Sequence, residues 1–93
     1  MYSKNQQELL KFLGPKYTIK EIDMEPCFYR KINHKYDIEI SGTFRKNRPI
    51  NVYVWDISNG EGIDAVIVEK FCDISGWGEL KALLENIIEK YRD

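Results

Sequence analysis

Hydrophobic residues recur at helical spacing near both ends of the chain. In residues 3–13 the apolar side chains share one broad side of a helix: Leu9, Leu10, Phe12 and Leu13. Ser3 is a suitable N-cap, and Gln6 three positions later completes a capping box. Gly14 accepts the left-handed conformation and Pro15 cannot continue a helix, so the first helix is predicted to end there.

Residues 73–93 repeat the helical spacing. The apolar positions on the predicted inner side are Trp77, Leu80, Leu84, Ile87, Ile88 and Tyr91. Asp73 or Ser75 is expected to cap this helix. The two glycines in the segment ISGWGE weaken its first turn, so we expect the helix to begin near Glu79.

Between the two helices the pattern changes to alternation. Residues 35–44 alternate strictly between apolar and polar side chains, which predicts a strand with one dry face and one wet face. Residues 27–32, 50–57 and 62–71 are predicted as further strands. Residues 17–24 fit a strand less well, because their two isoleucines differ in parity. The sequence leaves open whether this segment joins the sheet.

The connections between strands predict which side chains share a face. Asn33-His34 and Asn59-Gly60 are expected to be two-residue hairpin turns, and residues 45–49 a longer loop. These registers predict one mainly aliphatic face made of Cys27, Tyr29, Ile38, Ile40, Phe44, Ile50, Val52, Val54, Ile63, Ala65 and Ile67. Amphipathic helices need an apolar surface to cover, so both helices are expected on this face.

The predicted architecture is therefore one α+β domain over residues 1–93. It is an antiparallel meander of four or five strands, with the N- and C-terminal helices packed on one face of the sheet. A chain of this length can bury one modest core.

The reverse face of the predicted sheet carries an apolar band among polar side chains. The band consists of Phe28, Tyr53, Trp55, Val66 and Val68. Such residues can pack across strands, anchor a protein interface or stack bases. Asp37, Glu39 and Asp64 are expected on the same face, where their charges would repel phosphates. A protein interface is therefore favoured over a nucleic-acid interface.

Charged residues are also expected at the two ends of the sheet. Arg45, Lys46 and Arg48 lie in one predicted loop, which can hold a phosphate or an acidic surface or can be a solvated turn. Glu61 lies in the acidic turn at the opposite end, near Asp64. These two turns give the predicted domain a charge dipole.

Composition and motifs narrow the possible functions. The net charge of −1 gives no general attraction to nucleic acid or anionic membrane, and no apolar run approaches the ~18 residues of a membrane span. The N-terminus lacks a secretion-signal pattern, so a cytoplasmic protein with reduced Cys27 and Cys72 is expected. There is no Walker, GxGxxG, CxxC or HExxH motif, and the only histidine, His34, lies in a predicted turn. We therefore predict no enzymatic activity, no metal and no cofactor.

Two fragments resemble a known family. The segments YDIEISGT and IVEKFCDISGW are similar to pieces of a Cas9 inhibitor from the small phage-encoded anti-CRISPR proteins. Members of that group include compact α+β domains of about this length that inhibit Cas nucleases. The resemblance implies a protein partner in a CRISPR–Cas complex and a place in the host cytoplasm. The group has no shared motif, so the resemblance implies no particular site residue.

Three functional hypotheses follow from these patterns. The first is a non-enzymatic protein-binding module that inhibits a host defence complex by covering one of its surfaces. Its anchors would be the aromatic residues Phe28, Tyr53 and Trp55, with acidic side chains facing a basic target. The second is a homodimer that buries its aromatic sheet face. The third is a nucleic-acid-binding domain that uses the basic loop.

Overall fold

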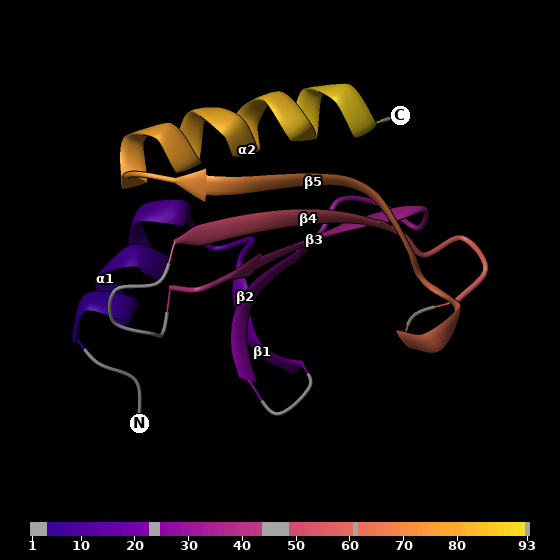
Figure 1. Cartoon of the computed structure of the whole chain (residues 1–93), viewed down its shortest axis with the longest axis horizontal. Helices are drawn as coiled ribbons and strands as arrows, with labels where there is room; N and C mark the ends of the chain where they lie inside the picture. Colours follow the sequence, from indigo (N-terminus) through magenta and orange to yellow (C-terminus); the bar gives the residue numbers. More distant parts are fainter. Residues whose placement is uncertain (1–3, 23–24, 44–48, 61, 93) are drawn as a thin grey trace.

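The chain folds as a five-stranded antiparallel sheet with a helix at each end of the sequence (Figure 1). The computed structural model describes residues 4–22, 25–43, 49–60 and 62–92. In chain order the elements are α1 (Lys4–Leu13), β1 (Thr18–Ile22), β2 (Glu25–Lys31), β3 (Tyr36–Ser41), β4 (Ile50–Asp56), the 3-10 helix η1 (Gly62–Asp64), β5 (Val66–Ile74) and α2 (Trp77–Tyr91). The strands lie in the order β1-β2-β3-β4-β5, so the predicted meander is confirmed and β1 belongs to it.

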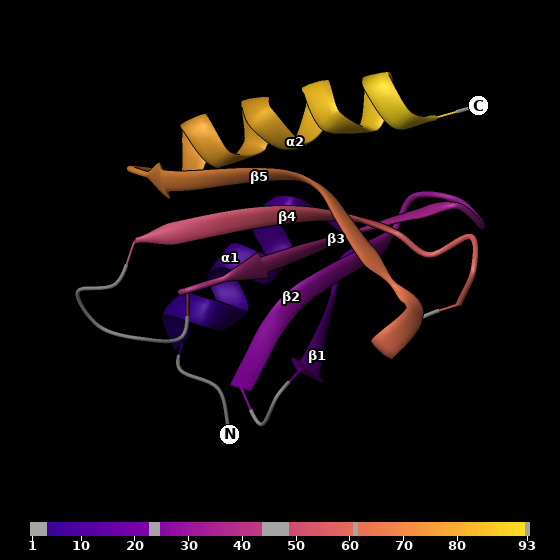
Figure 2. The ribbon, with the colours of Figure 1, turned by 45° about the vertical axis from the view of Figure 1, so that its right-hand side comes forward.

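Both helices contribute to one hydrophobic core on the same face of the sheet. Its buried members are Leu9, Leu13, Tyr17, Phe28, Ile38, Ile40, Val52, Val54, Ile74, Leu80, Leu84 and Ile87. Figure 2 shows α1 behind the strands and α2 along β5, which leaves the other face of the sheet without an α-helix. Leu9 and Leu13 of α1 and Leu80, Leu84 and Ile87 of α2 are buried, as predicted. Phe12, which was predicted on the same side of α1, is 39% exposed.

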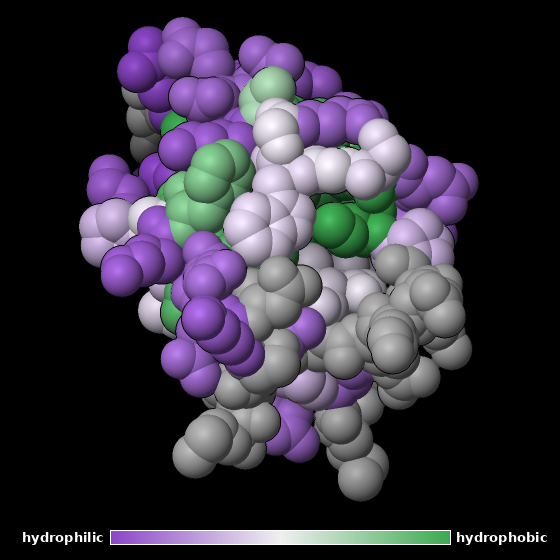
Figure 3. All heavy atoms as spheres, turned by 90° about the vertical axis from the view of Figure 1, so that its left-hand side faces the viewer, coloured by the Kyte–Doolittle hydropathy of each residue, from purple (hydrophilic) through white to green (hydrophobic). Residues whose placement is uncertain are grey.

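The helices meet at the end of the molecule that Figure 3 shows, where small hydrophobic areas lie among hydrophilic side chains. The rings of Phe12 and Trp77 pack there with their centroids 5.8 Å apart. The Lys81 ammonium lies 4.7 Å from the centroid of the Phe12 ring and donates to the Phe12 carbonyl oxygen. These contacts connect α1 to the first turns of α2.

The C-terminal end of α1 agrees with the sequence, and the start of α2 differs from it; Ser3, the predicted N-cap of α1, lies outside the described residues. Gly14 follows α1 with φ +108° and donates its backbone N–H to the Leu10 carbonyl, as a glycine C-cap requires. The second helix begins at Trp77 and not near Glu79, because the Leu80 N–H already bonds to the Gly76 carbonyl. The prediction that Asp73 or Ser75 caps this helix was wrong, since the N-cap is Gly76 without a side-chain bond.

The register between β2 and β3 differs from the predicted one by a single residue. Asn33 Oδ1 accepts the backbone N–H groups of Lys35 and Tyr36, so the connection is an Asx turn longer than the expected two-residue turn. Phe28 therefore pairs with Ile40. Because neighbouring residues of a strand face opposite sides, Phe28 lies on the helix face and Cys27 on the other. The sequence had predicted the reverse for both residues.

The register between β3 and β4 keeps the predicted faces. Ile40 pairs with Val52 and not with the expected Val54, a shift of two residues that leaves every side chain on its side of the sheet. Gly42 follows β3 with φ +87°.

The connection from β4 to β5 is longer than predicted and reverses several side chains. Asp56 Oδ1 accepts from the N–H and the hydroxyl of Ser58, and Gly60 donates to the Ile57 carbonyl, so the turn is centred on Ser58-Asn59, one residue before the predicted Asn59-Gly60. β5 then begins only at Val66, and a register shift lies between Val54 and Trp55. The prediction that Ile63, Ala65 and Ile67 share the helix face was therefore wrong.

The C-terminal end of α2 is held to the sheet by polar contacts. Asn33 Nδ2 donates to the Tyr91 carbonyl at 3.0 Å. Glu69 of β5 accepts from Lys90 Nζ at 2.7 Å and from the Tyr91 hydroxyl at 2.5 Å. The pKa of the Glu69 carboxyl group is lowered, mainly by the hydrogen bond from Lys90 and to a smaller extent by the one from Tyr91. Burial, followed by the bond to Glu69, raises the pKa of Tyr91 to about 12.

These pKa shifts predict how the stability contribution of Glu69 depends on pH. A carboxylate with a lowered folded-state pKa stabilises the fold above its unfolded pKa and loses this effect as the pH falls. A tyrosine with a raised pKa loses its contribution as the pH rises from about 10 toward 12. We expect Glu69→Gln to lower the free energy of unfolding by about 1 kcal/mol near neutral pH. The difference from wild type should shrink at both pH extremes.

Urea denaturation of both proteins across the pH range measures this difference. Glu89→Gln is the matched control, because Glu89 forms a more exposed ion pair with Arg92. We expect this control to change the free energy of unfolding by less than about 0.5 kcal/mol. A Glu69→Gln effect that stays constant with pH would contradict the assignment.

Candidate functional site

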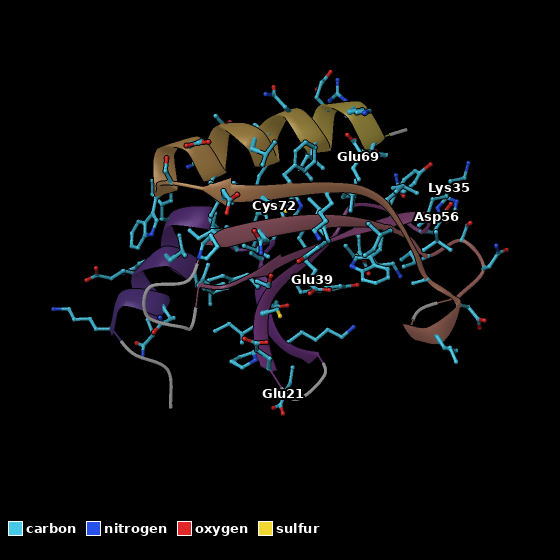
Figure 4. All side chains as sticks on the ribbon, in the orientation of Figure 1. Glu21, Lys35, Glu39, Asp56, Glu69 and Cys72 are labelled. Atoms are coloured by element: carbon cyan, nitrogen blue, oxygen red, sulfur yellow. The ribbon has the colours of Figure 1, made fainter. Side chains whose placement is uncertain are left out.

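The face of the sheet without α-helices is hollowed into a groove of about 800 Å³. The β1–β2 hairpin borders one side and the η1–β5 segment the other, and Figure 2 shows the start of β5 crossing in front of the strands. The groove is lined by Lys20, Glu21, Glu25, Cys27, Tyr29, Asp37, Glu39, Ser41, Tyr53, Trp55, Ile57, Ile63, Ala65 and Ile67. In Figure 4, Glu21 and Glu39 lie on the side of the sheet away from α2.

Three half-buried aromatic side chains line this groove: Tyr29, Tyr53 and Trp55. Glu39 pairs with Tyr29 on β2 and with Tyr53 on β4, so a carboxylate lies between the two tyrosines. The Lys20 ammonium lies 4.4 Å from the centroid of the Tyr29 ring, and the Lys70 ammonium lies 5.6 Å from that of Tyr53. The two tyrosine rings therefore already interact with cations of the same chain.

Carboxylates dominate the charge of the groove. The described lining residues include one ammonium, that of Lys20, and the carboxylates of Glu21, Glu25, Asp37 and Glu39. Asp37 is only 6% exposed. Glu39 contacts two neighbouring side chains: its Oε1 accepts a hydrogen bond from Trp55 Nε1 at 3.1 Å, and its Oε2 lies 3.9 Å from Cys27 Sγ. The groove therefore favours a positively charged ligand.

One wall of the groove is apolar. It consists of Ile63, Ala65 and Ile67, and Ile63 is 99% exposed. Val66 and Val68, beside this wall on β5, are also exposed. These residues place hydrophobic surface next to the carboxylates of Asp37 and Glu39, which form the acidic floor of the groove. Protein interfaces commonly combine apolar and charged contacts in this way.

The structure brings together four of the residues predicted for protein binding: Tyr53, Trp55, Asp37 and Glu39 line the groove. Phe28 does not join them, because it is 0% exposed in the core; the shifted β2 register makes that prediction wrong. Asp64 is exposed on η1, and the residue opposite Trp55 is Ile67 and not Asp64 as predicted. Glu61 and the basic loop residues Arg45, Lys46 and Arg48 lie outside the described residues.

Sequence reasoning missed Tyr29 and the β1–β2 side of the groove. Tyr29 was expected beneath the helices because Asn33-His34 was interpreted as a two-residue turn. The signal for the correct register was Asn33 itself, since an asparagine side chain can bond to backbone N–H groups beyond it and lengthen the turn. Lys20 and Glu21 enter the site only because β1 pairs with β2.

Two further properties bear on the kind of site. Within residues 4–22, 25–43, 49–60 and 62–92, no group of three or more His, Cys, Asp or Glu side chains is arranged to hold a metal ion. Neither helix in the described part of the chain combines the length and apolar character needed to cross a membrane. His34 is exposed in the β2–β3 connection, as predicted.

Fold and groove together define a small α+β domain with an antiparallel sheet, helices on one face and an acidic, aromatic hollow on the other. Comparison with protein-family models, with curated proteins and with solved structures finds no match.

Proposed function

We propose that this protein is a non-enzymatic binding module whose groove receives a basic, partly apolar segment of a partner protein. The observation that carries the proposal is the combination of acidic floor, aromatic side chains and apolar wall in one hollow. A basic side chain gains from the carboxylates and the rings, and an apolar neighbour gains from Ile63 and Ile67. Phosphate groups would be repelled by Asp37 and Glu39, which disfavours nucleic acid at this surface.

The concave shape favours a protruding partner over a second copy of the same face. A twofold dimer that buried this face would bring identical patches together. Two acidic hollows would then face each other, and their carboxylates would repel. Neither copy would offer a protrusion that fills the groove of the other. The homodimer hypothesis from the sequence is therefore the weaker alternative for this surface.

The partner that we propose to test first is a CRISPR nuclease, as the resemblance of the two fragments implies. Such nucleases hold their guide–target duplex in a positively charged channel. An acidic module that covers part of such a channel would block access of DNA without chemistry of its own. The proposed role is inhibition by surface occlusion in the host cytoplasm.

Selection from a displayed random peptide library tests the binding module itself. We expect enrichment of peptides that combine Arg or Lys with apolar residues, and weaker binding at high salt because the attraction is electrostatic. Trp55→Ala should abolish the enrichment. Phe12→Ala, a change at an exposed aromatic residue on the opposite face, should keep it. Enrichment of acidic peptides, or enrichment that survives Trp55→Ala, would contradict the proposal.

DNA cleavage by purified Cas nuclease–guide complexes tests the proposed partner. We expect the wild-type protein to slow cleavage by a susceptible nuclease and Glu39→Lys to lose this effect, with thermal unfolding used to confirm that the variant is folded. If peptides bind the groove but cleavage by every tested nuclease is unchanged, the proposal of a CRISPR nuclease as partner is wrong, and the proposal of a binding module remains.

A further inference from the structure

Trp55 differs from the other aromatic residues of the groove. Tyr29 and Tyr53 have the ammonium groups of Lys20 and Lys70 near their rings. No lysine or arginine among the described residues lies over the Trp55 ring, whose one polar atom is bonded to Glu39. Tryptophan is the aromatic side chain that attracts cations most strongly. The groove therefore contains a half-buried indole that is bonded at its edge and has no cation of the described residues over its ring.

The neighbours of Trp55 in the sheet have opposite character. Asp37 pairs with Trp55 from β3, and Ile67 pairs with it from β5, so the three residues form one row across the sheet. Glu39 extends the charged side of the row, and Ile63 and Ala65 extend the apolar side. A side chain lying along this row would meet carboxylates at one end and aliphatic surface at the other.

We propose that this row binds an arginine side chain of the partner. The guanidinium plane stacks on the indole with its N–H groups toward the carboxylates, and the methylene stem lies against Ile67. Arginine fits better than lysine, because a planar, weakly hydrated guanidinium can stack and donate at the same time. This inference rests on the proposed function and makes it specific for one side chain.

Titration with single amino-acid derivatives tests the inference without the natural partner. Trp77→Phe leaves Trp55 as the only tryptophan, so its indole N–H gives one assignable NMR signal. We expect N-acetyl-arginine amide to shift this signal with a dissociation constant on the order of 1–10 mM at constant ionic strength. The citrulline derivative, which has nearly the same shape and no charge, should bind at least about tenfold more weakly. The lysine derivative should also bind more weakly than arginine.

Glu39→Gln separates charge from position. A glutamine oxygen can still accept the Trp55 N–H, so the free indole signal should move little, whereas arginine binding should weaken by about tenfold. Equal binding of arginine and citrulline, equal binding of arginine and lysine, or no shift up to about 100 mM would overturn the inference. If lysine-containing peptides still bound and still required Trp55, the arginine site would be wrong and the proposed binding function would stand. If no peptide bound the groove at all, the arginine site and the proposed function would both be wrong.

Discussion

Replacement of Phe28 by alanine is expected to lower the free energy of unfolding by about 3–5 kcal/mol. Phe28 is among the largest side chains that are fully buried, and it lies in the core with Ile38 and Ile40. Alanine would remove most of this apolar surface from the interior and leave a cavity that the surrounding side chains fill only partly. For a domain of this size such a loss is a large share of the total stability.

Urea denaturation with a matched aromatic variant checks this expectation. Tyr53→Ala removes a ring from the groove side of the sheet and should cost less than about 1 kcal/mol. The two variants thus distinguish the faces of the sheet. If Phe28→Ala unfolded at the same urea concentration as wild type, the β2–β3 register and the whole assignment of faces would be wrong.

Replacement of Gly42 by alanine is expected to cost about 3 kcal/mol or more. Gly42 has φ +87°, a conformation that costs an L-residue about 1–2 kcal/mol. A methyl group there would also lie 3.1 Å from the carbonyl carbon of Pro49 and far inside contact distance of its oxygen. Both obstacles are backbone atoms at the base of the β3–β4 connection, so a side-chain rotation cannot relieve them.

Gly14→Ala separates the two causes. Gly14 also has a positive φ, +108°, but a methyl group at this position would meet no atom within 4 Å. Gly14→Ala should therefore lower the free energy of unfolding only by the cost of the left-handed backbone conformation, about 1–2 kcal/mol. Thermal or urea unfolding of both variants gives the comparison, and equal losses would mean that the close approach of Pro49 to Gly42 has no energetic effect.

The hydrophobic pattern predicted the elements of this fold well and their pairing less well. Helical spacing identified the buried residues of α1 and α2, and alternation identified β3 and β4, because both patterns depend on local geometry. Three registers differ from the predicted ones, and the two differences that moved side chains to the other face, β2–β3 and β4–β5, have the same physical origin. Asn33 and Asp56 each accept a backbone N–H two residues further along the chain, and these bonds displace the turns predicted from the neighbouring residues.

The candidate site was predicted in part for the same reason. Trp55, Tyr53 and Glu39 are correctly placed because the β3–β4 register shifted by two residues, which preserves the faces of a strand. Phe28 was misplaced because the β2–β3 register shifted by one. The apolar wall at Ile67 was missed because the long connection and the bulge after Val54 turn the start of β5 toward the groove.

Residue spacing alone was enough to predict the α+β class, the C-terminal end of α1, the inner sides of both helices and the outward direction of Trp55. These features depend on residue spacing within one element, and spacing is written in the chain. The pairing of the strands in the folded chain places Tyr29 and Ile67 beside the same hollow as Trp55, and Phe28 in the core. Those outcomes depend on how strands pair, and a single side-chain hydrogen bond in a turn can move a register by one residue and exchange the two faces.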